Sequence, residues 1–291
     1  MFKPLAILKP MFAAALLLGA LPAAAMPPAI FTDPPHDAAH PARLEVLHIP
    51  SGVVEIDGVA YLAAGAGPHP TLVICHGWPG NEKNLDLAQA VRRAGWNAVT
   101  FNYRGSWGSP GAFRFAHNPE DAAAVLAYLR APANAAKLGV DPARIAIAGH
   151  SMGGWVAALI GARDPKISGV ALFSMADMGN IGRMPRAEIV KLSAGNAETL
   201  AQTSPEQMAD ELTANSLAFT VGQAAAGLAT RPLLVLTADD GLAGDADKLV
   251  AEVRAAGGTQ ITTQHVATDH SWNDSRIALE SAVIDWLATL R

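Results

Sequence analysis

The chain of 291 residues contains a single cysteine, Cys75, and therefore cannot form a disulfide bond within itself. Cys75 lies in an apolar segment, where a cysteine is most often an inert thiol in the core. The small folds that depend on several disulfides are thus excluded. A domain of this length is expected to be stabilised by its hydrophobic core alone.

Charged residues are also few, at 16% of the chain, and leave a net charge of −5. No basic cluster interrupts this mild acidity, which argues against a nucleic acid as the partner. No spacing of histidines or carboxylates completes a metal site around the paired Asp239 and Asp240, so neither a metal nor another cofactor is expected. Hydrophobic residues make up 51% of the chain, enough for the core of one large α/β domain.

The N-terminal segment, residues 1–25, has the features of a signal peptide. Lys3 and Lys9 give it a positive start, residues 11–18 are apolar, and Ala23-Ala24-Ala25 matches the small-residue pattern of a cleavage site. The apolar stretch is short for a membrane span, which needs about 20 residues. We therefore expect cleavage before Met26 and export to the periplasm or outside the cell, without a stable membrane span. An uncleaved N-terminal anchor is the alternative.

Segments typical of strands and helices alternate after a proline-rich lead-in, residues 26–41, which we expect to be flexible. Two antiparallel strands come first in the domain that spans 42–291. The strands are predicted at 44–49, 53–62, 71–75, 98–103, 145–148, 170–173, 233–236 and 261–266. The main helices are predicted at 85–94, 119–129 with Asn118 as the cap, 155–160, 246–255 and 277–290. Alternation of this kind builds a mostly parallel sheet with helices on both faces.

Residues 176–230 interrupt the alternation because they contain no strand pattern. Ser204, followed by Pro205 and Gln207, is typical of a helix start. The segment leaves the carboxyl end of a strand, where open α/β sheets bind their ligands. We therefore expect a helical cap over the functional site, with a helical excursion packed on the flank of the sheet as the alternative.

The most informative pattern is Gly149-His150-Ser151-Met152-Gly153, which fits G-x-S-x-G between an apolar strand and a helix. A serine on so sharp a turn has a strained backbone, and side chains two positions before or after it would collide with the strand or the helix. The two glycines therefore let the turn close with the Ser151 hydroxyl exposed, as a nucleophile requires. A glycine-rich turn with an ordinary serine is the alternative.

A serine hydroxyl needs a base to take its proton, so the pattern demands a histidine. Of the nine histidines, His270 is the best placed, because it follows the last strand on the edge of the sheet that carries the serine turn. The imidazole in turn needs an acid, and Asp239 and Asp240 stand at the carboxyl end of the preceding strand. Asp269, beside His270, is a further candidate, but we expect it to contact the loop backbone.

The oxyanion of a tetrahedral intermediate needs backbone donors. The N–H of Met152, at the start of the helix after the serine, is one candidate. The other is the N–H of Trp78, in the loop His76-Gly77-Trp78-Pro79-Gly80 that follows a strand. A purely structural turn is the alternative interpretation of this loop.

Together these motifs resemble the α/β-hydrolase superfamily over nearly all of the expected mature chain, residues 26–291, in the branch of small esterases, dienelactone hydrolases and prolyl-oligopeptidase-like enzymes. The matching motifs are the serine turn, the 76–80 loop, Tyr103-Arg104-Gly105 with Gly108, Asp239-Asp240-Gly241, and Asp269-His270. The resemblance implies a triad of Ser151, Asp240 and His270, with Trp78 and Met152 as oxyanion donors. Strand ends of the family usually carry one more residue before the aspartate, so Asp239 stays open.

The implied activity is hydrolysis of a carboxylic ester through an acyl-enzyme intermediate. An exported serine peptidase is one alternative, although the sequence lacks the paired glutamates with which related dipeptidyl peptidases hold a substrate amine. A non-catalytic binding protein on this fold is the other, although no triad position is missing. An apolar acyl group is expected from the residues that flank these motifs, Trp78, Trp107, Phe113, Met152 and Trp155, unless they serve core packing.

Overall fold

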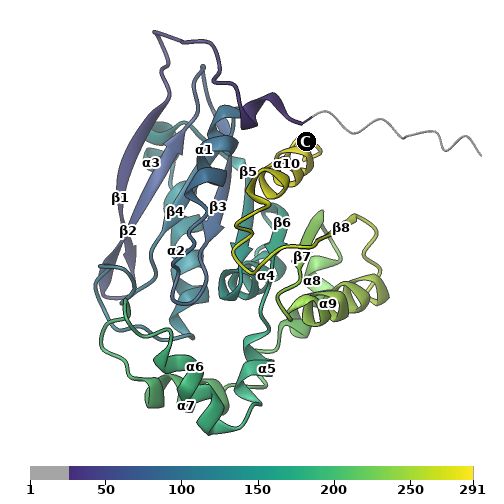
Figure 1. Ribbon diagram of the computed structural model, residues 1–291. Coiled ribbons are helices and arrows are strands. Elements are labelled where there is room, and N and C mark those ends of the chain that lie inside the picture. The colour runs from purple at the N-terminus through teal and green to yellow at the C-terminus, as the bar shows by residue number, and fades with distance from the viewer. Residues whose placement is uncertain (1–25, 291) are drawn as a thin grey trace, which may run out of the picture.

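The computed structural model describes residues 26–290, so the predicted signal peptide lies outside the described residues (Figure 1). None of the helices between Met26 and Leu290 is long and apolar enough to cross a membrane. The lead-in contains a short 3-10 helix, η1 (Pro28–Ile30), and Arg93 donates hydrogen bonds to the carbonyls of Ala29 and Ile30. This part of the lead-in therefore lies against the domain.

Eight strands form one sheet in the order β1-β2-β4-β3-β5-β6-β7-β8. The pairs β1–β2 and β2–β4 are antiparallel, and all later pairs are parallel. The strands are β1 (Arg43–Ser51), β2 (Val54–Leu62), β3 (His69–Cys75), β4 (Asn97–Phe101), β5 (Val140–His150), β6 (Ile167–Phe173), β7 (Leu233–Ala238) and β8 (Ile261–Val266). The predicted class, a mostly parallel sheet with helices on both faces, is confirmed.

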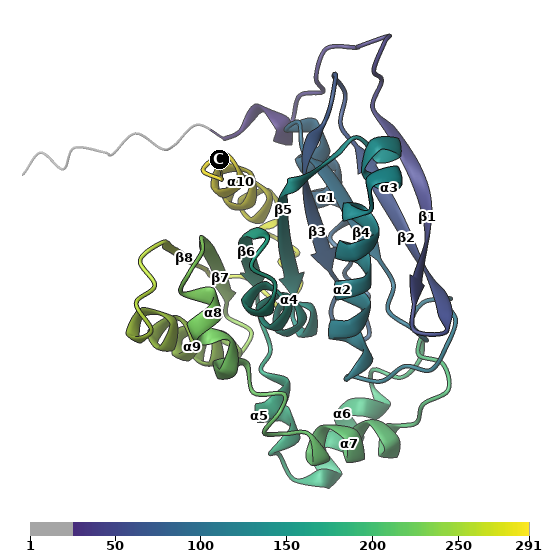
Figure 2. The ribbon, with the colours of Figure 1, turned by 180° about the vertical axis from the view of Figure 1, so that it is seen from behind.

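Helices cover both faces of the sheet (Figures 1 and 2). One face packs against α1 (Leu85–Arg93) and α10 (Arg276–Leu287), and the other against α2 (His117–Arg130), α3 (Pro132–Leu138), α4 (Met152–Arg163) and α9 (Ala243–Ala255). Successive side chains of a strand enter opposite clusters: Leu72 and Ile74 join the first face, Val73 and Cys75 the second. The central strands are apolar because helices cover both of their faces, whereas the edge strands β1 and β8 also carry exposed residues.

One helix start was predicted wrongly. Helix α2 begins at His117, and Asn118, the expected cap, lies buried within its first turn. The cap position is held instead by Ala116, which already has helical backbone angles. The Asn118 amide donates to Met152 Sδ at 3.2 Å, so packing against α4 decides its position.

The segment between β6 and β7 forms short helices, most of them beyond the carboxyl ends of the strands (Figure 1). They are α5 (Met178–Gly182), α6 (Arg186–Ala194), α7 (Pro205–Ala214), η2 (Val221–Ala224) and α8 (Ala225–Leu228). The helix start at Ser204 is confirmed, since Ser204 Oγ accepts from the Gln207 N–H. The turn before α7 is tied to the loop after β4, because Trp107 N donates to Thr199 O and Phe113 N to Ala201 O, each at 3.0 Å.

Candidate active site

Ser151 lies on the turn between β5 and α4 with φ 58° and ψ −124°. Non-glycine residues seldom adopt such angles, which persist where the surrounding structure enforces them. Here the Ser151 N–H donates to Phe173 O at 3.0 Å, and the Ser151 carbonyl accepts from Ala176 N at 3.1 Å and from Gly154 N at 2.9 Å. The ends of two strands and the first turn of α4 thus hold the serine in its strained conformation.

The glycines around the serine are required because any side chain there would clash with the backbone. A Cβ on Gly149 would lie 1.9 Å from Gly153 O, and a Cβ on Gly153 would lie 2.1 Å from Cys75 O. The steric argument made from the sequence is confirmed at both positions. A Cβ on Gly77 would come within 3.0 Å of the Ser151 Cβ, so the loop after β3 passes directly against the serine.

His270 lies in the loop between β8 and α10, and its Nδ1 is 2.9 Å from Asp240 Oδ2. The Asp240 side chain, two residues beyond β7, is only 2% exposed. Burial raises the pKa of Asp240, but hydrogen bonds from His270 and Ser174 outweigh it and lower that pKa to about 2. The ionised carboxylate accepts the Nδ1 proton of His270, which leaves the lone pair of a neutral imidazole on Nε2.

The other two candidate acids have different partners. Asp239 Oδ1 lies 3.0 Å from His265 Nε2 on the exposed side of β8. The Asp269 carboxylate accepts from the backbone N–H and the side-chain amide of Asn273, so it contacts the loop as expected. Among these three aspartates, Asp240 is the one that hydrogen-bonds to His270.

Ser151 and His270 line the same cavity, which has a volume of about 170 Å³. Asn196, from the turn after α6, also lines this cavity. Most of the cavity's side chains are polar, and the polar members are Asn81, Glu82, His150, Ser151, Asn196, His270 and Ser271.

The two predicted oxyanion donors flank the serine. Met152 is the first residue of α4, where a backbone N–H has no partner within the helix. Trp78 lies in the loop that presses Gly77 against Ser151. Within residues 26–290, neither N–H donates a hydrogen bond to another group, so both remain free to donate to a ligand oxygen.

The apolar residues expected near the site are mostly structural. Phe113, Met152 and Trp155 are buried in the core. Trp107 is partly exposed, and its Nε1 donates to Pro79 O at 2.7 Å, which fastens the loop after β3. Of the five, Trp78 lines the cavity.

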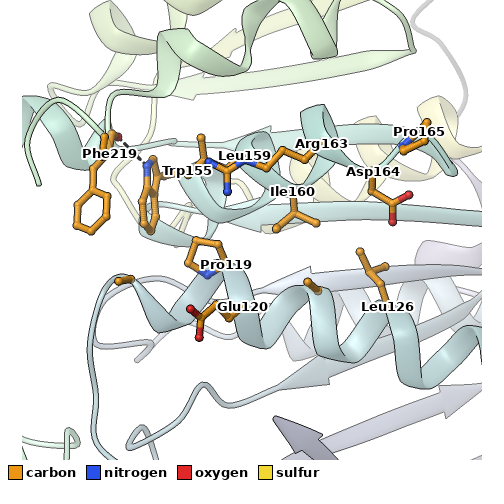
Figure 3. A pocket seen from close by; sticks show the side chains of 13 residues that line it. Pro119, Glu120, Leu126, Trp155, Leu159, Ile160, Arg163, Asp164, Pro165 and Phe219 are labelled. Atoms are coloured by element: carbon orange, nitrogen blue, oxygen red, sulfur yellow. Dashed lines mark hydrogen bonds between the residues drawn. The ribbon is translucent and has the colours of Figure 1, made fainter. Parts of the chain in front are cut away.

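A larger cavity of about 670 Å³ lies between α2 and α4 (Figure 3). Its wall is largely apolar, with Pro119, Leu126, Trp155, Ile160 and Phe219. It includes none of Ser151, Asp240 and His270, whereas Ser151 and His270 line the smaller cavity. In the described part of the chain, no three histidine, cysteine or carboxylate side chains gather as a metal site would need.

A model of the alpha/beta hydrolase family matches residues 72–280 of the chain. An uncharacterized protein of Mycobacterium tuberculosis, strain H37Rv, is 27% identical over 143 residues, which are 49% of this chain and 49% of that protein. The same figures hold for an uncharacterized protein of strain CDC 1551. The matched region thus spans about half the length of these curated relatives.

Solved structures share the fold at low sequence identity. Pyrococcus horikoshii acylaminoacyl peptidase superimposes with a TM-score of 0.66 at 14% identity, over 86% of this chain and 41% of that chain. A Pyrobaculum calidifontis esterase gives 0.63 at 19% identity, over 87% and 88%. The thermostable carboxylesterase EstE1, cloned from a metagenomic library, gives 0.59 at 20%, over 87% and 91%.

Proposed function

The chain belongs to the alpha/beta hydrolase family, and from this premise we propose that it is a serine hydrolase that cleaves a carboxylic ester through an acyl-enzyme intermediate. The observation that carries the proposal is the 2.9 Å hydrogen bond between His270 and the buried Asp240, beside a strained serine. In this proposal Ser151 is the nucleophile, His270 the base and Asp240 the acid that orients it.

Acylation begins when His270 Nε2 takes the proton of Ser151 Oγ and Oγ attacks the ester carbonyl carbon. The oxyanion that forms accepts hydrogen bonds from the N–H groups of Trp78 and Met152, each worth about 3 kcal/mol in the transition state. The imidazolium of His270 then protonates the departing alcohol oxygen, which leaves the acyl group on Ser151.

Deacylation repeats these steps with water. His270 takes a proton from a water molecule whose oxygen attacks the acyl carbon, and the proton returns to Ser151 Oγ as the acid leaves. The cavity of about 170 Å³ favours an ester with a short acyl group, for which Trp78 offers an apolar surface.

The proposal is tested by labelling the intact protein with a fluorophosphonate, which reacts with activated serines. We expect one adduct, on Ser151, located by peptide mass spectrometry. Ser151→Ala should take no label and should lower kcat for p-nitrophenyl acetate on the order of 10⁶-fold. The control is Ser168→Ala, at the amino end of β6, which should label and turn over normally. Labelling of another serine, or full turnover by Ser151→Ala, would contradict the proposal.

A further inference from the structure

His150 precedes the serine and has no role in the mechanism just described. It ends β5 with only 4% of its surface exposed. Its Nε2 lies 2.7 Å from the backbone carbonyl oxygen of His270, and the two imidazole rings are 4.7 Å apart between centroids. A side chain on the serine turn therefore contacts the backbone of the residue proposed as the base.

The direction of this hydrogen bond fixes the tautomer of His150. A carbonyl oxygen can only accept, so Nε2 carries the proton and donates it. Nδ1 then holds a lone pair, and this buried atom has no hydrogen-bond partner in the part of the chain that the structure describes. Burial, together with the charge that His270 can carry, lowers the pKa of His150 to about 4. His150 is therefore neutral at neutral pH and does not repel an imidazolium at His270.

This hydrogen bond links the histidine loop to the residue directly before the serine. His150 and Ser151 are consecutive residues, so a hydrogen bond from His150 to His270 sets the spacing between the serine turn and the histidine loop. Asp240 holds the imidazole of His270 from β7. Arg276 holds the loop further along, since its Nη1 donates to Ser271 O at 3.1 Å. Of these three contacts, the one from His150 comes from the serine turn itself.

We infer that His150 is a positioning residue, whose Nε2–H holds the His270 backbone so that the imidazole faces Ser151 while it stays on Asp240. The inference rests on the proposed function, because it assigns His270 as the base. A displacement of about 1 Å at a reacting group can cost on the order of 10²-fold in rate. Loss of the donor should thus lower kcat while substrate binding is retained.

The test compares His150→Met with His150→Gln, two side chains of similar length and volume of which only glutamine has a donor. We expect His150→Met to lower kcat for p-nitrophenyl acetate by about 10- to 100-fold, with KM changed by less than about threefold. His150→Gln should recover most of the loss. Proton NMR supplies a second readout, because the Nδ1 proton shared by His270 and Asp240 should give a downfield resonance. It should broaden or vanish in the methionine variant and remain in the glutamine variant.

His150→Phe, which keeps an aromatic ring without a donor, repeats the test if methionine does not fold. Equal kcat values and equal resonances in the donor and non-donor variants would overturn the inference, because His150 would then only fill space. Equally impaired variants, both without the resonance, would also overturn it. If the wild-type protein neither labels nor hydrolyses esters, the proposed function fails. The resonance comparison still decides whether His150 positions His270.

Discussion

Asp239 and Asp240 are neighbours in sequence, but their carboxylates contact different histidines, His265 and His270. Both residues lie in the turn that follows β7, and this turn directs their side chains to different partners. The sequence does not predict the contact of Asp239 with His265, which depends on the register that sets Thr237 opposite His265 in the β7–β8 pair.

Replacing each aspartate by asparagine distinguishes their roles, because the two variants should differ in kcat. Asp240→Asn keeps the shape of the side chain but favours the wrong tautomer of His270, so kcat should fall about 10⁴-fold. Asp239→Asn disturbs an exposed contact and should cost less than about tenfold. Initial rates with p-nitrophenyl acetate, on variants with unchanged circular dichroism, measure both. The reverse ranking would assign the acid role to Asp239, and two mild variants would point to Asp269 or to a dyad.

Other residues of the site had no signal of their own in the sequence. Ser174 follows β6, accepts the Nε1–H of the buried Trp272, and stabilises the charge of Asp240. Asn196 lines the cavity from the turn after α6. Both contacts join segments distant along the chain, so they follow from the fold and not from a local pattern. The position of His150 beside the serine is visible in the sequence, but its partner, the backbone carbonyl of His270, is visible only in the structure.

At the scale of elements, the β5–α4 turn was the part most fully predictable from the sequence. The turn needs a positive φ at Ser151 and no side chain at Gly149 or Gly153. The five consecutive residues from Gly149 to Gly153 show all of these requirements in the sequence. The segment between β6 and β7 was harder to predict, because backbone groups make its hydrogen bonds to the loop after β4 and such bonds do not depend on residue type.

A substitution at Gly153 measures how tightly the turn is packed. In Gly153→Ala the added methyl would overlap the Cys75 carbonyl, whose strand backbone cannot move away easily. We expect the free energy of unfolding to fall by about 3 kcal/mol, measured by urea denaturation. Gly244→Ala is the matched control, since nothing lies within 4 Å of the added atom and the residue is in helix α9. It should be neutral or stabilising by up to about 1 kcal/mol, and equal effects of the two substitutions would refute the packing argument.

At the scale of the whole molecule, two apolar clusters enclose the sheet, and charged groups join helices that are distant in sequence. Arg276, at the start of α10, donates to the Asp86 carboxylate in α1 and to Asn84 Oδ1. Glu280, one turn further along α10, lies beside Asp86. Burial, then the charge of Asp86, raises the pKa of Glu280 from 4.5 to about 7.

This shift predicts a pH-dependent gain from Glu280→Gln. Below pH 4.5 the carboxyl is protonated in both the folded and the unfolded chain, so the neutral amide changes little. Between pH 4.5 and about 7 the unfolded chain releases the Glu280 proton while the folded protein still holds it, so wild type loses stability that the variant keeps, and the loss is complete above pH 7. We expect the variant to be more stable by about 1 kcal/mol at pH 8, measured by urea denaturation. The exposed Asp285→Asn in the same helix is the control, and a gain that is the same at low and high pH would contradict the assignment.

The helix η1 and the end of α10 lie close together, at the end of the molecule opposite α6 and α7 (Figure 1). The described chain therefore enters and leaves the domain far from the edge that carries Ser151. A solid support or a fusion partner joined at residue 26 or residue 290 would contact the distal end of the domain. The protein could thus be immobilised at either of these two residues with its serine turn on the side away from the support, where dissolved substrate arrives by diffusion.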